Sequence, residues 1–340
     1  MTGGSRQEKL AIVGISGGTN IGESLRRASI AARQFGSFFD AYEAWRGSRI
    51  LRALKWRFLD RRPLRLDAFS RKVVDECART RPKYLISTGI APLTEASLRV
   101  LRRLDVTCIN YSTDDPWNRS HRAEWHLRAL KNYDLVFTPR RSNIQDFIDA
   151  GCADVRYLPF AYDDELFGPG APSDLTVSHD LLFVGGADRD RVAFIAGIVN
   201  SGLRPAVVGD YWNRFPETRG FDLGHKDPKA LRALTAAAAV NLCVVRHANR
   251  DGNVMRSFEI PAVGGFMLAE DTPEHREIFG TEGQCVLYFT TPEGAADKAR
   301  WALANPSERR RMAAAAHELI VGGGHTYRDR LMQMLSVVNS

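Results

Sequence analysis

Residues 251–271 have the sequence DGNVMRSFEIPAVGGFMLAED. The small residues at its start predict a loop, and a short helix follows, because Pro261 lacks an N–H and is tolerated only near a helix start or at a kink. Gly264-Gly265 ends this helix, since glycine readily takes the left-handed conformation found there. The apolar run 266–269 then predicts a short buried strand. The stretch therefore reads as loop, short helix, glycine pair and strand.

Two carboxylates in this stretch, Asp251 and Glu259, indicate its chemistry. A carboxylate on a helix can accept hydrogen bonds from two vicinal hydroxyls. The amides of the preceding loop and of the helix N-terminus attract an anion. Sugar hydroxyls next to phosphate are the features of a nucleotide sugar, so the stretch predicts a site for such a ligand.

The run from Arg256 to Phe266, with Glu270-Asp271 behind it, resembles the C-terminal motif of CgeB-like (spore-maturation-protein-like) glycosyltransferases of the GT-B fold. The spacing of Asp251 and Glu259 is similar to a motif of the wider retaining group (glycosyl transferase group 1), with Asp replacing the first of two glutamates. The resemblance implies that Glu259 binds the donor ribose and that Asp251 is catalytic, near the donor sugar. The alternative is that Glu259 is a buried carboxylate capping a helix.

Composition predicts a cytoplasmic protein of two domains. The 340 residues hold no apolar run near the ~20 residues of a membrane span, and the polar segment Met1–Lys9 shows no secretory signal. Five scattered cysteines predict buried thiols in a reducing compartment. Residues 1–165 hold 28 Lys and Arg against 20 Asp and Glu, and the remainder holds 19 against 20. The first half is therefore expected to meet an acidic partner.

The chain opens with an apolar strand from Leu10, a glycine turn over 16–22 and a helix, which is the start of a Rossmann-like unit. Thr19 stands where the middle glycine of a dinucleotide-binding G-x-G-x-x-G would lie, which argues against NAD. The resemblance implies that Gly17 and Gly18 face the acceptor or the donor phosphates. A tight turn without a ligand is the alternative.

Asp114 and Asp115 follow the strand expected over 105–112. Ligands of open α/β sheets bind beyond the carboxyl ends of the strands, and similar Asp-Asp-Pro segments occur here in the CgeB-like family. One aspartate is expected to orient or deprotonate the acceptor hydroxyl, with Asp115 preferred, and the other to cap a helix beginning near Asn118. His121 and His126 on that helix do not share a face, so no metal site is expected.

The second half opens with a strand and glycine turn over 179–186, again Rossmann-like. In the retaining relatives an arginine after the first glycine and a lysine further on hold the diphosphate. Here Gly186 follows Gly185 in the arginine position, and Arg191 falls in the lysine position. Arg191 is therefore the first phosphate candidate, and the arginine fork suits phosphate. The second charge is expected from one of three others, which are Arg189, Arg246 and Arg256.

Three further residues are donor-site candidates. Asn253 lies in the loop before the short helix, and His225 and Lys226 lie in the loop that contacts the base in GT-B relatives. A solvated loop is the alternative for the last two. Asp188 and Asp190 match an Asp-x-Asp metal motif of another glycosyltransferase fold, but their position before a helix favours a capping role.

Together these features predict an α/β protein of the GT-B fold, with two Rossmann-like parallel-sheet domains facing each other across a cleft. An acceptor-side domain is expected over 1–167, a linker rich in Pro and Gly over 168–178, a nucleotide-sugar domain over 179–321, and over 322–340 a helix crossing back. The expected reaction moves a sugar from a nucleotide diphosphate sugar to a hydroxyl of a glycan or lipid-linked acceptor, with retention and without metal or cofactor. The alternatives are a nucleotide-sugar epimerase or hydrolase, and a non-catalytic nucleotide- or glycan-binding protein, which Gly186 and Asp251 favour.

Residues 45–72 form a cationic stretch in which 46–72 hold ten basic residues against Asp60 and Asp67. Read as a helix to about Leu59, the stretch places four apolar side chains in one ~100° arc, namely Ile50, Leu51, Leu54 and Phe58. The hypothesis is that it docks on the anionic inner leaflet or recruits an anionic lipid-linked acceptor. The alternative is that the apolar stripe packs on the first domain. No recognised nucleic-acid motif accompanies the charge, so nucleic acid is not expected.

Overall fold

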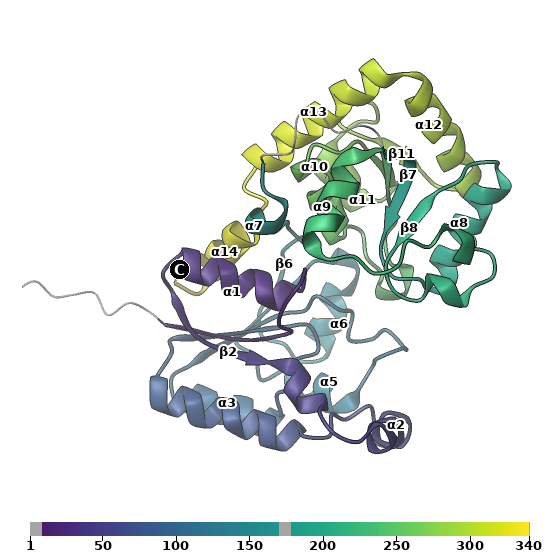
Figure 1. The fold of residues 1–340 in the computed structure, drawn as a ribbon. Coiled ribbons are helices and arrows are strands. Elements are labelled where there is room, and N and C mark those ends of the chain that lie inside the picture. Colours follow the sequence, from purple (N-terminus) through teal and green to yellow (C-terminus); the bar gives the residue numbers. More distant parts are fainter. Residues whose placement is uncertain (1–8, 170–177, 340) are drawn as a thin grey trace, which may run out of the picture. The chain divides into compact units, whose positions relative to one another are not determined.

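The computed structural model describes residues 9–169 and 178–339. These residues form two compact units (Figure 1). The first unit contains the described residues up to Pro159, the short segment Ala248–Arg250, and the residues from Arg330 onward. The second contains Phe160–His247 and Asp251–Asp329. Residues 170–177 of the expected linker and 1–8 of the polar N-terminal segment lie outside the described residues.

The first unit is built on a six-stranded sheet with the order β2-β1-β3-β4-β5-β6. Every neighbouring pair is parallel, and parallel neighbours need crossover connections, which helices provide here. The strands are β1 (Leu10–Gly14), β2 (Phe35–Asp40), β3 (Tyr84–Thr88), β4 (Thr107–Tyr111), β5 (Leu135–Thr138) and β6 (Val155–Tyr157). The helices are α1 (Ile21–Ala31), η1 (Ala41–Trp45), α2 (Arg49–Phe58), α3 (Leu66–Thr80), α4 (Glu95–Arg103), α5 (Glu124–Leu130), η2 (Arg141–Asn143) and α6 (Ile144–Asp149).

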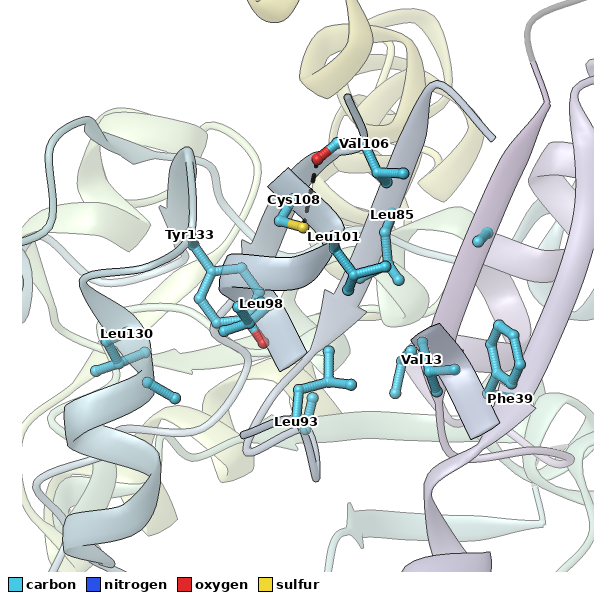
Figure 2. Packing of buried hydrophobic residues seen from close by; sticks show 14 of the residues in the cluster. Val13, Phe39, Leu85, Leu93, Leu98, Leu101, Val106, Cys108, Leu130 and Tyr133 are labelled. Carbon is cyan, nitrogen blue, oxygen red and sulfur yellow. Dashed lines mark hydrogen bonds between the residues drawn. The ribbon is translucent and has the colours of Figure 1, made fainter. Parts of the chain in front are cut away.

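The core of the first unit lies between this sheet and its helices. Figure 2 shows Leu98 and Leu101 of α4 gathered with Leu85 of β3 and with Tyr133. Strand β1 is buried along its whole length and β3 everywhere but at its last residue, as expected where helices cover both faces of a parallel sheet. This is why the apolar run from Leu10 correctly predicts β1.

The second unit has a five-stranded parallel sheet with the order β11-β10-β9-β7-β8. Its strands are β7 (His179–Val184), β8 (Ala206–Val208), β9 (Ala238–Cys243), β10 (Met267–Glu270) and β11 (Leu287–Phe289). Its helices are α7 (Asp164–Phe167), α8 (Arg189–Asn200), η3 (Trp212–Arg214), η4 (Arg219–Phe221), α9 (Pro228–Ala237), α10 (Met255–Ala262), α11 (Pro273–Phe279), α12 (Pro292–Ala304) and α13 (Pro306–Gly322). Two more elements, η5 (His247–Asn249) and α14 (Tyr327–Asn339), have residues in both units.

The direction of the strand order reverses between β7 and β9. From β7 the chain adds β8 on one side, and it then crosses to β9 on the other. Such a switch point leaves a crevice at the carboxyl ends of the two strands, where ligands of open α/β sheets bind. In the second unit this position is occupied by the loops that follow Val184 and Cys243.

The stretch 251–271 folds as its sequence predicts. Helix α10 has Pro261 in its last turn and ends at Ala262, and Gly264 then takes a positive φ of 77°. Strand β10 follows directly. The short helix therefore projects from the carboxyl end of β9, the strand beside the switch point.

Two expected elements differ from the structure. The sequence over 37–45 predicts a second strand, but strand β2 ends at Asp40, because the Asp40 carboxylate accepts the Tyr42 N–H at 3.0 Å and starts the 3₁₀ helix η1. The helix expected near Asn118 begins only at Glu124. Its first amides donate to Asp60, at 3.0 Å from Glu124 and 2.9 Å from Trp125, so a residue distant in sequence sets its start.

Candidate functional site

Arg191 lies at the switch point of the second sheet. It is in the first turn of α8, which begins after Asp188 accepts the Arg191 N–H at 3.0 Å. Its Nη1 donates to the Gly186 carbonyl at 3.3 Å, and its Nη2 to the Val244 carbonyl at 3.2 Å. The guanidinium thus joins the loops that follow β7 and β9. The expected capping role is confirmed for Asp188.

Two arginines share one carboxylate here. Asp188 Oδ2 lies 3.6 Å from Arg246 Nε and 3.9 Å from Arg191 Nε. The pKa of Arg191 is lowered to about 10 by burial and by Arg246, against the opposing effect of Asp188 and Asp251. Arg191 therefore remains charged at neutral pH, and the group has positive charge available for an anion. Arg189, by contrast, is exposed.

Glu259 is buried on α10, with 1% of its surface exposed. One carboxylate oxygen, Oε2, pairs with Arg256 one turn earlier. The other, Oε1, is buried and has no hydrogen-bond partner within the described residues. Leaving a buried polar atom unpaired is costly. An oxygen held in this state is therefore a strong candidate to accept a hydrogen bond from a ligand.

Arg256 is held in place by its surroundings. Its guanidinium carbon lies 5.8 Å from the centroid of the Phe167 ring on α7. Burial lowers the pKa of Arg256 to about 10, while Cys243 and Tyr327 act in the opposite direction. The guanidinium is charged at neutral pH and pairs with the Glu259 carboxylate. The pair thus presents an oriented carboxylate.

The loop before α10 is tightly constrained. A Cβ at Gly252 would lie 2.1 Å from the Glu274 carboxyl carbon, so a larger residue there would require the Glu274 side chain to move. The Gly252 carbonyl accepts a hydrogen bond of 2.6 Å from Thr272. Asn253 is fully buried, and its Oδ1 accepts the Phe160 N–H at 3.1 Å. Asn253 therefore supports the backbone around the site.

Asp251 is the partly exposed residue of this loop. Its N–H donates to the Arg246 carbonyl at 3.3 Å, and its carboxylate contributes to the electrostatic environment of Arg191. The structure therefore brings together Asp251, Arg246 and Arg191 at the end of the second sheet.

A buried network that the sequence reasoning missed sets the start of α10. Ser257 Oγ lies 2.7 Å from His275 Nε2, and His275 Nδ1 lies 2.7 Å from the Glu270 carbonyl. A carbonyl only accepts, so Nδ1 carries the proton and Nε2 accepts from Ser257. Ser257 Oγ also accepts the Val254 N–H at 3.0 Å. Ser257 at the third helical position was a local signal for this cap, whereas His275 had none.

The base-site candidates lie apart from these contacts. His225 has 77% of its side chain exposed, and its Nδ1 lies 3.5 Å from Asp210 Oδ1. Lys226 is partly exposed. No hydrogen bond or ion pair in the described part of the chain joins His225 or Lys226 to Glu259 or to the arginines.

In the first unit, Asp115 is engaged in holding a loop. Its carboxylate receives Arg250 Nε at 2.6 Å on Oδ2 and Nη2 at 3.0 Å on Oδ1. Oδ1 also accepts from the Trp117 N–H and from Asn143 Nδ2. With 1% exposure, this carboxylate has contacts that suit a structural role, and the catalytic role expected for Asp115 stays a prediction. Asp114 is the partly exposed member of the pair.

In the first glycine turn, a backbone amide is hydrogen-bonded to a carboxylate of the chain itself. Gly17 and Gly18 have positive φ values of 76° and 58° with open space around them. The Gly17 N–H donates to Glu23 Oε2 at 3.3 Å. Burial opposes ionisation of Glu23, but the hydrogen bonds from Arg26 and Gly17 outweigh it, so the pKa of Glu23 lies below its usual value. One amide of the turn is thus already used by a carboxylate.

The remaining expectations concern metals and membranes. Within residues 9–169 and 178–339, no group of three or more His, Cys, Asp or Glu side chains is placed to hold a metal ion. His121 lies in a loop with Nε2 2.8 Å from the Asp115 carbonyl, and His126 is buried in α5. No helix of the described chain has the length and apolar character needed to cross a bilayer.

Known structures share this architecture over nearly the whole chain. Sucrose-phosphate synthase from Thermosynechococcus elongatus superposes with a TM-score of 0.70 at 14% identity, covering 98% of each chain. Trehalose-6-phosphate synthase (OtsA) gives 0.65 at 13% identity, covering 96% of this chain and 98% of that one. The protein has the GT-B fold. Anabaena HepE in complex with UDP-glucose gives 0.67 at 13% identity, covering 97% and 99%.

Within this GT-B chain, residues 191–336 match a family described as glycosyl transferase-like. The matched segment begins at Arg191 and includes the whole stretch 251–271. A UDP-N-acetylglucosamine 2-epimerase, described as putative, from Listeria monocytogenes also shares the fold, with a lower TM-score of 0.59 at 12% identity and coverage of 97% and 96%. No curated protein sequence is significantly similar.

Proposed function

We propose that the protein is a glycosyltransferase that moves a sugar from a nucleotide diphosphate sugar to a hydroxyl acceptor. The observation that carries the proposal is Glu259, a buried carboxylate with one oxygen paired to Arg256 and the other without a partner in the described chain. It lies in the segment that matches the glycosyl transferase-like family. The geometry supports a donor site in the second unit.

In this proposal the ribose binds to Glu259. A carboxylate oxygen has two lone pairs, so Oε1 can accept a hydrogen bond from each of two vicinal hydroxyls or a strong one from either. Arg256 fixes the orientation of the carboxylate. Hydrogen bonds to charged groups are stronger than neutral ones, which makes the site selective for a ligand with hydroxyls at this position.

The diphosphate binds to Arg191 with Arg246 as the second cation. Arg191 is already oriented by the Gly186 and Val244 carbonyls, so little side-chain entropy is lost on binding. The two guanidinium groups share the Asp188 carboxylate, and a diphosphate would add further negative charge. Asp251, which follows Arg246 in the same loop, interacts with the donor sugar.

The reaction is proposed to retain the anomeric configuration and to need no metal. The acceptor oxygen forms a bond to the anomeric carbon, the bond from that carbon to the diphosphate oxygen breaks, and the hydroxyl proton leaves with the diphosphate. The arginines stabilise the charge that grows on the leaving group, and one such preorganised donor contributes ~10²–10³ in rate. Asp114 is proposed to orient the acceptor, a glycan or a lipid-linked glycan.

The test is a thermal-shift panel of nucleoside diphosphates and their sugars. A ligand at 100 times its Kd stabilises the folded state by ~2.7 kcal/mol, which is a readily measured shift. Donor consumption is then followed by NMR with and without hydroxyl acceptors. Absence of any shift with nucleotides contradicts the donor site. Isomerised or hydrolysed donor in the absence of acceptor supports an epimerase or hydrolase, and binding without sugar loss supports a non-catalytic protein.

A further inference from the structure

Helix α2 lies at the edge of the first unit (Figure 1), and its apolar stripe is exposed to solvent. None of its residues is buried. The four side chains of the stripe are all exposed, with exposed fractions of 73% for Ile50, 55% for Leu51, 48% for Leu54 and 69% for Phe58. The apolar stripe of a helix normally packs on the core. Here it does not, so the alternative of packing on the first domain is wrong.

The side of α2 opposite the stripe contacts the rest of the first unit. At 100° per residue, Trp56 lies across the helix from the stripe, and its ring is 5.7 Å from Trp45 of η1. Arg61 lies over the Trp56 ring at 5.8 Å and donates to the carbonyls of Arg122 at 2.7 Å and Arg119 at 2.9 Å. The helix is thus fixed with its stripe facing outward.

The charges around the stripe are almost all positive. Four basic residues of α2 form no ion pair with any carboxylate in the described chain, and these are Arg49, Arg52, Lys55 and Arg57. The two acidic residues of 46–72 are already used. Asp60 accepts the amides at the start of α5, and Asp67 pairs with Arg62 at 2.8 Å. By the 100° count, Lys55 and Arg57 flank the stripe on its two sides.

We propose that this surface, the α2 face, docks the protein on an anionic lipid bilayer. A bilayer interface accepts an apolar stripe and anionic headgroups neutralise its flanking cations at the same time. The long stems of Lys55 and Arg57 can follow the apolar surface while their charges stay in the headgroup layer. Charge complementarity favours this occupant over a second copy of the chain, because two α2 faces would place like charges against each other.

The proposal does not rest on the proposed enzymatic function. It rests on the exposure of the stripe and on the unpaired cations, and it assigns this face a role distinct from the donor site. A lipid-linked acceptor would reach the enzyme at the same surface, but membrane binding is expected with or without nucleotide.

The test is sedimentation of the full chain with vesicles. One set is neutral phosphatidylcholine and the other contains phosphatidylglycerol, each at low and at high salt. The protein should sediment only with the anionic vesicles, and less at high salt because screening weakens the attraction. Retention in the supernatant with anionic vesicles at low salt overturns the proposal.

Two variants separate the contributions. The triple substitution Ile50→Ser, Leu54→Ser and Phe58→Ser removes the stripe, and Lys55→Glu with Arg57→Glu reverses its flanks. Because each basic residue near an anionic surface contributes roughly fivefold to partitioning, the second variant should lose well over tenfold in binding. All five side chains lie outside the core, so both variants are expected to fold, and circular dichroism verifies it.

A matched control reverses two exposed charges elsewhere, Arg103→Glu on α4 and Arg310→Glu on α13. This control has the same net charge as the Lys55/Arg57 variant and should keep most of the binding. An equal loss in the control shows that only net charge matters and overturns the assignment to α2. Analytical ultracentrifugation provides the last arm, since a dimer that dissociates in the stripe variant assigns the face to a second copy instead.

Discussion

Replacing Glu259 with glutamine tests the donor site most directly. The substitution keeps the side-chain volume but removes the charge that Arg256 orients and that Oε1 offers to a ligand. Hydrogen bonds to charged groups contribute ~1.5–3 kcal/mol, so the Kd for the best nucleoside diphosphate should rise by about 10–150-fold. Calorimetric titration measures this, after a thermal melt shows that the variant is folded at the assay temperature.

A second ligand makes the test specific. The 2′-deoxy form of the same nucleotide removes one of the hydroxyls proposed to donate to Glu259. If the two groups interact, the losses caused by Glu259→Gln and by the deoxy ligand do not add, because each removes the same hydrogen bond. The control variant Glu293→Gln changes an exposed carboxylate on α12 and should bind like wild type. Strictly additive losses, or an unchanged Kd in Glu259→Gln, refute the ribose assignment.

Four further results are expected. Asp251→Asn should lower turnover far more than nucleotide affinity, since its proposed partner is the donor sugar; equal losses in both would move Asp251 to a structural role. Turnover should survive EDTA, and a complete loss restored by Mg²⁺ or Mn²⁺ would contradict the metal-free reaction. Gly252→Ala should lower the melting temperature, because its Cβ would lie 2.1 Å from the Glu274 carboxyl carbon; a wild-type melt would show that the loop relaxes freely. Burial lowers the pKa of His126 from 6.5 to about 3, so as the pH falls below 6.5 the unfolded chain takes up a proton that the folded chain refuses. Stability should then fall by ~1.4 kcal/mol per pH unit, and the variant His126→Phe should lose about 2 kcal/mol less than wild type between pH 7 and pH 5 in denaturant titrations; parallel losses would contradict this account.

The strands and the two strand–glycine–helix starts could be predicted because their signals are local. Leu10–Gly14 and His179–Val184 are apolar runs followed by glycine turns, and parallel strands covered on both faces have that composition. Helix α3 was not predicted, although its signal is also local. Its buried residues Leu66, Phe69, Val73 and Cys77 have helical spacing, but the surrounding positive charge directed the interpretation to a surface.

The contacts that define the candidate site depend on residues far apart in the chain. Asp115 pairs with Arg250, 135 positions away. No local pattern predicts this ion pair, so the sequence alone suggests that the Asp115 carboxylate is free to contact a substrate. His275 reaches Ser257 across 18 positions. The motif predicts Glu259 as a ligand residue, but only the fold shows that one of its oxygens is paired and that the other has no partner in the described chain. The packing of the fold decides which residues face each other, and the periodicity of the sequence does not predict these contacts.

The segment Ala248–Arg250 restricts where this chain can be recombined with a related sequence. It belongs to the first unit although its neighbours His247 and Asp251 belong to the second, and Asn118 and Asp115 hold it through Asn249 and Arg250. A chimera joined at residue 160 would therefore combine Asp115 from one parent with residue 250 from another. Unless the second parent also has arginine there, a buried carboxylate is left without its cation. Recombination between relatives should succeed more often when positions 115 and 250 travel together than when the crossover simply follows the boundary between the units.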